Sequence, residues 1–320
     1  MNRRTRIWLI AAVLLVVAGA ALFAVAMGGS DWNFNLLSTT EYETNTYEIR
    51  ETFSGICVDT STADITIASS NDGKCRVQCY EETKEKHSVS VQGEKLTISL
   101  VSEKAWYDYV GVNFETPKIT VYLPGEMYDS LTIREDTGDV EVPEAFSFAQ
   151  ADISASTGDV RFGASVSDLL KIRTSTGRIH VEGASAGELD LTASTGQITV
   201  TDVDCQGDVK LRVSTGKTAL NHVTCGSLTS EGDTGDLVLT NVMVAGILTV
   251  TRSTGDVRFE ASDAAEIFVE TETGDVTGTI LSSKVFFTET DTGSVRVPKS
   301  TTGGKCQITT DTGDIKLDIA

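Results

Sequence analysis

Six aspartates recur at one position of a repeated pattern and could together bind a metal ion. Each follows a recurring glycine, and they are Asp139, Asp159, Asp236, Asp256, Asp275 and Asp314. If equivalent residues stack at the spacing of neighbouring strands, about 4.8 Å, a divalent cation would relieve the repulsion between their carboxylates. A carboxylate beside glycine is also typical of a tight turn, where it accepts hydrogen bonds from the backbone.

The aspartate column is interrupted, which favours the turn over the cation. Arg178, Gln197 and Lys217 take the same position in three repeats, and a basic residue opposes cation binding. The glycine-rich nonapeptide of calcium-binding β-helices is absent. We therefore assign no metal site, and keep three residues as weak candidates for cation binding: Asp236, Asp256 and Asp275.

Other residues that could carry chemistry are few. The chain has three His and six Cys, and no two cysteines form a Cys-x-x-Cys pair, so the sequence does not favour zinc. Cys205 and Cys225 occupy equivalent places in adjacent repeats, and we interpret them as buried thiols. Residues 106–109, Trp-Tyr-Asp-Tyr, are the one aromatic cluster that could stack on a sugar, although hairpin packing explains them as well. We predict no catalytic residue and no cofactor.

The recurring glycines define the elements that must position these residues. Ten Thr-Gly pairs lie 19 or 20 residues apart, and Ser61-Thr62-Ala63-Asp64-Ile65 resembles a degenerate earlier copy. Glycine permits a positive φ at a tight corner. We predict ten structural turn glycines: Gly138, Gly158, Gly177, Gly196, Gly216, Gly235, Gly255, Gly274, Gly293 and Gly313.

Each repeat contains two short runs with alternating apolar residues. One follows the glycine, as in Val160 and Phe162, and the other precedes the threonine, as in Leu170 and Ile172. Alternation places each pair on one face of a strand. Because a single coil cannot bury such a pair, the pattern predicts an all-β fold, a β-solenoid of about ten parallel stacked coils.

The segment before the solenoid has a different pattern. Asn71-Asp72-Gly73-Lys74 and Gln92-Gly93-Glu94-Lys95 each separate two β-like runs, which indicates hairpins. We expect this segment to cap the open end of the stack. We therefore divide the chain into a basic tail at 1–6, a helix at 7–27, a linker at 28–44, a hairpin or capping part at 45–130 and the solenoid at 131–320.

The N-terminus resembles a membrane anchor. Ile7–Met27 is uncharged, spans 21 residues and follows three arginines, so it is long enough to cross a bilayer with the N-terminus in the cytoplasm. Ala24-Val25-Ala26 could instead be a signal-peptide cleavage site, but the apolar run is long for a signal peptide. We favour an uncleaved, single-pass anchor in the cell membrane, with the bulk of the chain extracytoplasmic.

Three ordered motifs carry a family resemblance. They are Lys118-Ile119-Thr120-Val121-Tyr122-Leu123-Pro124, Ser130-Leu131-Thr132-Ile133 and Thr137-Gly138-Asp139-Val140, and the hairpin at 93–98 also fits. Together they resemble the bacterial putative-adhesin family of β-strand-repeat proteins, domain of unknown function 4097, over roughly residues 45–320. The resemblance implies a β-solenoid envelope protein and brings no catalytic residues.

The net charge and the uniform coil length argue against nucleic-acid binding and against catalysis. Residues 31–320 carry 23 Lys and Arg against 46 Asp and Glu, a net charge of −23, which opposes binding to nucleic acid. Uniform coils leave no inserted loops to wall a catalytic groove. We expect a non-enzymatic, adhesin-like or structural envelope protein with an unidentified envelope or surface ligand. The alternatives are an accessory or sensor of envelope signalling that acts through a membrane partner, and a polysaccharide-acting β-helix enzyme.

The sequence also suggests self-association. The chain ends in the coil Thr312–Ala320, and no capping element follows it. If this coil were the end of the stack, its unpaired backbone groups could pair with those of a second copy. We expect a weak end-to-end homodimer that salt strengthens, because each chain is strongly acidic.

Overall fold

The computed structural model describes residues 3–28, 40–104, 115–125 and 127–320. They fall into two compact units. One comprises residues 1–43, 82–85 and 102–115, and the other comprises 44–81, 86–101 and 116–320. The first contains the single helix α1, Arg3–Gly28. The aromatic residues 106–109 and most of the expected linker lie outside the described residues.

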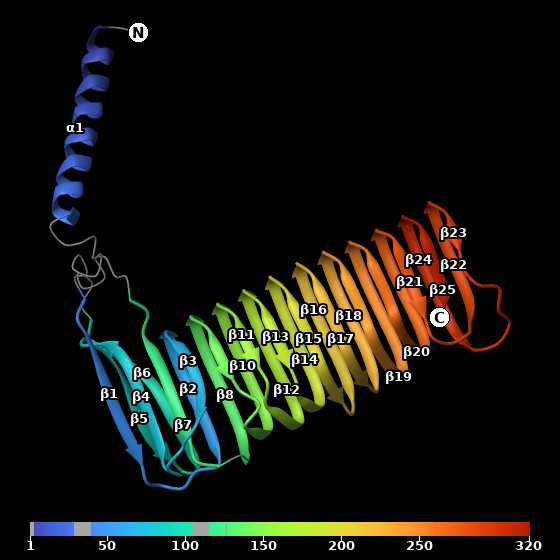
Figure 1. Ribbon diagram of the computed structural model, residues 1–320, viewed down its shortest axis with the longest axis horizontal. Helices are drawn as coiled ribbons and strands as arrows, with labels where there is room; N and C mark the ends of the chain where they lie inside the picture. The colour runs from blue at the N-terminus through green and yellow to red at the C-terminus, as the bar shows by residue number, and fades with distance from the viewer. Residues whose placement is uncertain (1–2, 29–39, 105–114, 126) are drawn as a thin grey trace. The chain divides into compact units, whose positions relative to one another are not determined.

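The larger unit is an all-β solenoid (Figure 1). Its N-terminal part contains β1 (Tyr42–Ile49), β2 (Gly55–Thr62), β3 (Asp64–Ser69), β4 (Cys75–Glu82), β5 (Glu85–Gln92), β6 (Lys95–Ser102) and β7 (Lys118–Leu123). The coils follow as β8 (Met127–Thr137), β9 (Val140–Val142), β10 (Ser147–Thr157), β11 (Val160–Phe162), β12 (Ser165–Thr176), β13 (Ile179–Glu182), β14 (Ser185–Thr195), β15 (Ile198–Cys205), β16 (Asp208–Thr215), β17 (Thr218–Cys225) and β18 (Ser227–Thr234). The last are β19 (Leu237–Thr254), β20 (Val257–Thr273), β21 (Val276–Ile280), β22 (Lys284–Thr292), β23 (Val295–Arg296), β24 (Gly304–Thr312) and β25 (Ile315–Ile319).

Equivalent strands of neighbouring coils pair in parallel and in register, as the repeat predicted. Thr157 pairs with Thr137 on one side and with Thr176 on the other, and Val160 pairs with Val140 and Ile179 in the same way. The degenerate copy is also confirmed, because Thr62 pairs with Thr137. The alternating apolar pairs of the coils from β8 to β12 point inward, and their side chains are at most 1% exposed in Leu131, Ile133, Val160, Phe162, Leu170 and Ile172. The hairpin expected around residues 71–74 is wrong, because β3 pairs with β7 and β9, and β4 pairs with the other side of β7.

The glycine corner brings the backbones of neighbouring coils into close contact. All ten repeat glycines have a positive φ, between 132° and 159°. A Cβ added to Gly235, for example, would lie 2.0 Å from the carbonyl oxygen of Gly216 in the preceding coil. A side chain therefore cannot fit at this corner unless the two coils separate.

A second corner follows the repeat glycine in five of the coils. Six residues after the repeat glycine, the backbone adopts the left-handed conformation, with φ of 67° at Gly183, 51° at Asp202, 52° at His222 and Asn241, and 48° at Ala261. Glycine, asparagine and aspartate tolerate this conformation best. Gly183, Asp202 and Asn241 are therefore suited to this turn, whereas Ala261 adopts the conformation without such a preference.

The end of the stack differs from the expectation that the chain's last coil forms it. β24 lies between β20 and β22, and β25 lies between β21 and β23. The coil of β22 and β23 is therefore outermost, and the chain returns to insert its last coil beneath it (Figure 1). The expectation was wrong because the two coils carry the same pattern, and sequence order does not decide which one lies outside.

A buried ion pair fastens this arrangement. The Nζ atom of Lys284 on β22 lies 2.7 Å from the Oδ1 atom of Asp263 on β20, and the lysine side chain is only 2% exposed. Gly304 lies between them in the inserted strand, and a Cβ built there would be 3.7 Å from Cδ of Lys284. Removing one partner of a buried pair costs about 3–5 kcal/mol because the other charge is left uncompensated.

Two ionisable side chains lie in one inward column of the stack. The column lies two residues before the repeat threonine. From the N-terminal end it consists of Glu135, Ala155, Thr174, Ala193, Val213, Gly232, Arg252, Thr271 and Thr310. Glu135 is 4% exposed, and neither carboxylate oxygen has a hydrogen-bond partner. Burial, followed by repulsion from neighbouring aspartates, raises its pKa to about 8.

Arg252 is the buried cation of the same column. It is 3% exposed, donates to Ser230 Oγ at 2.8 Å, and leaves Nε and Nη1 without a partner. Gly232 in the preceding coil makes room for it, since a Cβ there would lie 2.1 Å from Nη1. Burial lowers the pKa of this guanidinium to about 10.

The glycine corner predicts an asymmetric response to two adjacent substitutions. Gly235→Val should lower the free energy of unfolding by about 3 kcal/mol or more, because its side chain meets the preceding coil. Asp236→Asn should cost less than about 1 kcal/mol, because an amide oxygen can still accept the bond that Asp236 receives. Urea unfolding of both variants measures the difference. Equal losses would contradict the assignment of this corner.

Glu135 predicts a loss of stability as the pH rises. A folded pKa of about 8, above the ordinary value of 4.5, means that the folded chain binds an extra proton between these values. This contribution is complete below pH 4.5 and is lost as the pH rises through 8. Urea unfolding at pH 5 and pH 8 should show a loss of about 2–4 kcal/mol that Glu135→Gln abolishes and that the exposed control Glu141→Gln retains. An identical pH dependence in all three proteins would refute it.

Candidate functional site

The repeated aspartates lie at the glycine corner and hydrogen bond from coil to coil. Oδ1 of Asp236 accepts from the backbone N–H of Asp256 at 3.0 Å, and Oδ1 of Asp256 accepts from that of Asp275 at 2.9 Å. Asp275 accepts in the same way from Asp314 at 2.7 Å. One oxygen of each weak cation candidate is thus occupied by the next coil. The cation-binding hypothesis stays a prediction, and the observed bonds fit the structural turn.

Basic residues neutralise parts of this column. Arg178 contacts Oδ2 of Asp159 through Nε at 3.0 Å and Nη2 at 2.6 Å, and this pairing lowers the pKa of Asp159. At the other end, the side chain of Lys316 holds the pKa of Asp314 to about 2. Both carboxylates are ionised at neutral pH, and each already has a cationic partner.

A cavity of about 610 Å³ lies in the N-terminal part of the solenoid unit. The rings of Phe53 and Tyr128 are stacked at its wall, with centroids 5.9 Å apart. Charged residues complete the lining, among them Glu48, Arg50, Glu51 and Lys74. Aromatic and charged groups together can bind a polar ligand that also has an apolar face.

The N-terminal part also holds a buried group of potential metal ligands, which the sequence analysis did not single out. The Sγ of Cys79, a carboxylate oxygen of Glu81 and a ring nitrogen of His87 all lie within 4.8 Å of one another. The three side chains are buried, at 0%, 0% and 3% exposure. Alternation along β4 places residues 79 and 81 on the same inward face, and β5 brings in His87.

A hydrogen-bonded chain orders this group. Oε2 of Glu81 accepts from the backbone N–H of His87 at 2.6 Å and lies 2.7 Å from Nδ1 of its ring. Oε1 of Glu81 accepts from Nδ2 of Asn45 at 2.8 Å. The other ring nitrogen, Nε2, lies 2.9 Å from Oγ1 of Thr60. A hydroxyl, an imidazole and a carboxylate thus lie in line, but their burial closes them to a large substrate.

All six cysteines are free thiols in the structure. Five are buried and Cys57 is partly exposed. Burial raises the pKa of Cys75 to about 11 and that of Cys79, Cys225 and Cys306 to about 12. Protonated thiols of this kind are poor nucleophiles.

Comparison with solved structures shows the same fold in bacterial proteins. One is described as a putative adhesin from Parabacteroides merdae ATCC 43184, with a TM-score of 0.50 and 14% identity, and the match covers 77% of this chain and 98% of that one. A second, a putative adhesin from Parabacteroides distasonis ATCC 8503, has a TM-score of 0.50 and 12% identity, with 87% and 98% coverage. No curated protein matches the sequence.

The family follows from the sequence itself. Residues 53–318 match the Toastrack DUF4097 family. The match begins after β1 and spans the rest of the N-terminal part, the glycine corners and the inserted last coil. The protein belongs to the Toastrack DUF4097 family.

Proposed function

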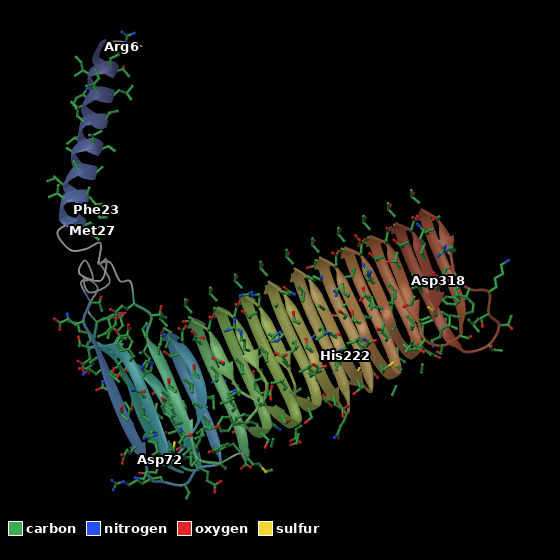
Figure 2. The ribbon with its side chains drawn as sticks, in the orientation of Figure 1. Arg6, Phe23, Met27, Asp72, His222 and Asp318 are labelled. Atoms are coloured by element: carbon green, nitrogen blue, oxygen red, sulfur yellow. The ribbon has the colours of Figure 1, made fainter. Side chains whose placement is uncertain are left out.

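We propose that this protein is a membrane-anchored, extracytoplasmic β-solenoid that acts as a non-enzymatic, adhesin-like envelope protein. The observation that carries the proposal is α1. Its segment Thr5–Val25 is long and apolar enough to span a bilayer, and none of it is buried within the described protein. Side chains project on all sides of the helix (Figure 2). In water such a helix would expose its apolar surface, whereas a bilayer covers it.

The orientation follows from the charges that flank the helix. Arg3, Arg4 and Arg6 lie at the N-terminal end of α1, and the strongly acidic solenoid follows the helix. By the positive-inside rule, the basic end stays in the cytoplasm and the solenoid is exported. The relatives described as adhesins are consistent with a surface location.

The form of the solenoid supports binding rather than catalysis. Its coils between residues 138 and 313 keep one length, and the candidate acids at the corner already accept hydrogen bonds from neighbouring coils. We propose that an envelope or surface ligand contacts the cavity beside Phe53, because that cavity combines stacked aromatic rings with both signs of charge.

The outermost coil is the proposed contact in a weak end-to-end homodimer. β22 has no neighbouring strand beyond it among the described residues, and Phe287 and Val295 of this coil are 53% and 44% exposed. Unpaired backbone groups of an edge strand can bond a second copy. We therefore propose that the contact lies on β22 and β23 and not on the chain's last coil.

The topology predicts which ends of the chain react from outside the cell. In a Cys57→Ser background, Lys299→Cys should react with a membrane-impermeant maleimide on intact cells, because residue 299 is exposed in the solenoid. The matched variant Asn2→Cys should react only after lysis. Labelling of Asn2→Cys on intact cells with protection of Lys299→Cys would contradict the proposed orientation.

Self-association should depend on salt and on the outer coil. Sedimentation of the full chain in detergent should show more dimer at high salt, because screening weakens repulsion between acidic chains. Phe287→Glu should abolish the dimer at both salt concentrations. A dimer that persists in Phe287→Glu would place the contact elsewhere, and a monomer at high protein concentration in both buffers would remove it.

A further inference from the structure

We propose that Cys79, Glu81 and His87 bind one zinc ion inside the N-terminal part of the solenoid. The three residues offer a sulfur, an oxygen and a nitrogen donor, all within 4.8 Å of one another. Zinc is bound in proteins by these three donor types. A thiolate in the set disfavours magnesium and calcium, which prefer oxygen donors only.

The three side chains supply three of the four ligands of a tetrahedral site, and their donor atoms must shift to reach that geometry. Zinc bonds of about 2.0–2.3 Å place neighbouring donor atoms roughly 3.3–3.6 Å apart. The Nδ1–Oε2 pair is shorter, at 2.7 Å. Entry of the ion at Nδ1 would require the neutral ring to carry its single proton on Nε2, and would draw in Sγ, which lies within 4.8 Å of both atoms. Side-chain rotations suffice for such shifts.

The surrounding hydrogen bonds already orient the donor atoms. A histidine that ligates zinc usually donates its other ring N–H to an oxygen, which fixes the ring. With Nδ1 on the metal, Nε2–H would donate to Oγ1 of Thr60, which lies 2.9 Å away. The carboxylate is held similarly, since Asn45 donates to Oε1 and leaves Oε2 toward the other two donors.

The burial of the group indicates a structural role for the ion. All three side chains are at most 3% exposed, and no substrate path is needed for a structural metal. The donors come from β4 and β5, and the orienting groups come from β1 and β2. A bound zinc would therefore tie four strands of the N-terminal part together, and would stabilise the folded chain in proportion to its affinity.

Zinc binding requires a particular protonation state of each of the three ligands. Cys79 must lose its proton to ligate zinc, and that proton passes to buffer when the ion enters. The His87 ring must be neutral, and Glu81 must be ionised. Zinc binding should consequently release a proton, and no oxidant or reductant takes part.

The test is zinc titration of the full-length chain, purified in detergent and freed of metal by a chelator. The wild type should bind about one zinc per chain by elemental analysis and should melt at a higher temperature with zinc. Cobalt as a probe should give a thiolate-to-cobalt charge-transfer band. Cys79→Ser should lose the band, whereas the control Cys306→Ser, another buried thiol, should keep it.

A second variant separates metal binding from folding. Thr60→Val removes the group that orients the His87 ring and keeps all three donors, and it should weaken zinc binding about 10- to 100-fold. Its circular dichroism without metal should equal that of the wild type. The proposal is overturned if the wild type binds no more zinc than Cys79→Ser, or if Cys306→Ser loses the cobalt band equally.

Discussion

The close approach of backbones at the repeat glycine is the constraint on which the solenoid depends. At Gly235 the carbonyl of the preceding coil occupies the place of a Cβ, and the other repeat corners are equally tight. Each coil must therefore return to the same point after 19 or 20 residues. In-register parallel pairing follows, and with it the inward columns of apolar side chains and the outward aspartates that accept the next coil's amide.

Three sets of buried polar residues depart from the apolar pattern of the repeat. Glu135 and Arg252 are ionisable side chains buried in a column of mostly small residues, and neither has an opposite charge beside it. Burial therefore disfavours the charged form of each. The cluster of Cys79, Glu81 and His87 differs from both, because every polar atom of Glu81 and His87 has a partner. A sulfur, an oxygen and a nitrogen donor lie within 4.8 Å of one another in this cluster, and for that reason we propose the zinc site there and not at the repeated aspartates.

The sequence predicted what depends on periodicity, and missed what depends on neighbours distant along the chain. The glycine step and the alternating pairs were enough for the coils, and an uncharged run was enough for α1. The sequence of one coil does not show that β24 inserts between β20 and β22, because both coils fit the same register. The ion pair between Lys284 and Asp263, which passes Gly304, identifies the inserted strand only when the three residues are seen together in the fold. Likewise His87 and Thr60 are 27 residues apart, and only the fold brings them together.

Hydrogen–deuterium exchange, followed residue by residue in the full chain, tests the stacking most directly. Amides of a strand that is paired with a neighbouring coil on both sides exchange only when the coils separate. Amides of an edge strand that point away from the stack exchange with little protection. The account predicts slower exchange in β24 and β25, although they end the chain, than in β22 and β23, which precede them. Faster exchange in β24 and β25 than in β22 and β23 would contradict the inserted last coil and the order of the stack.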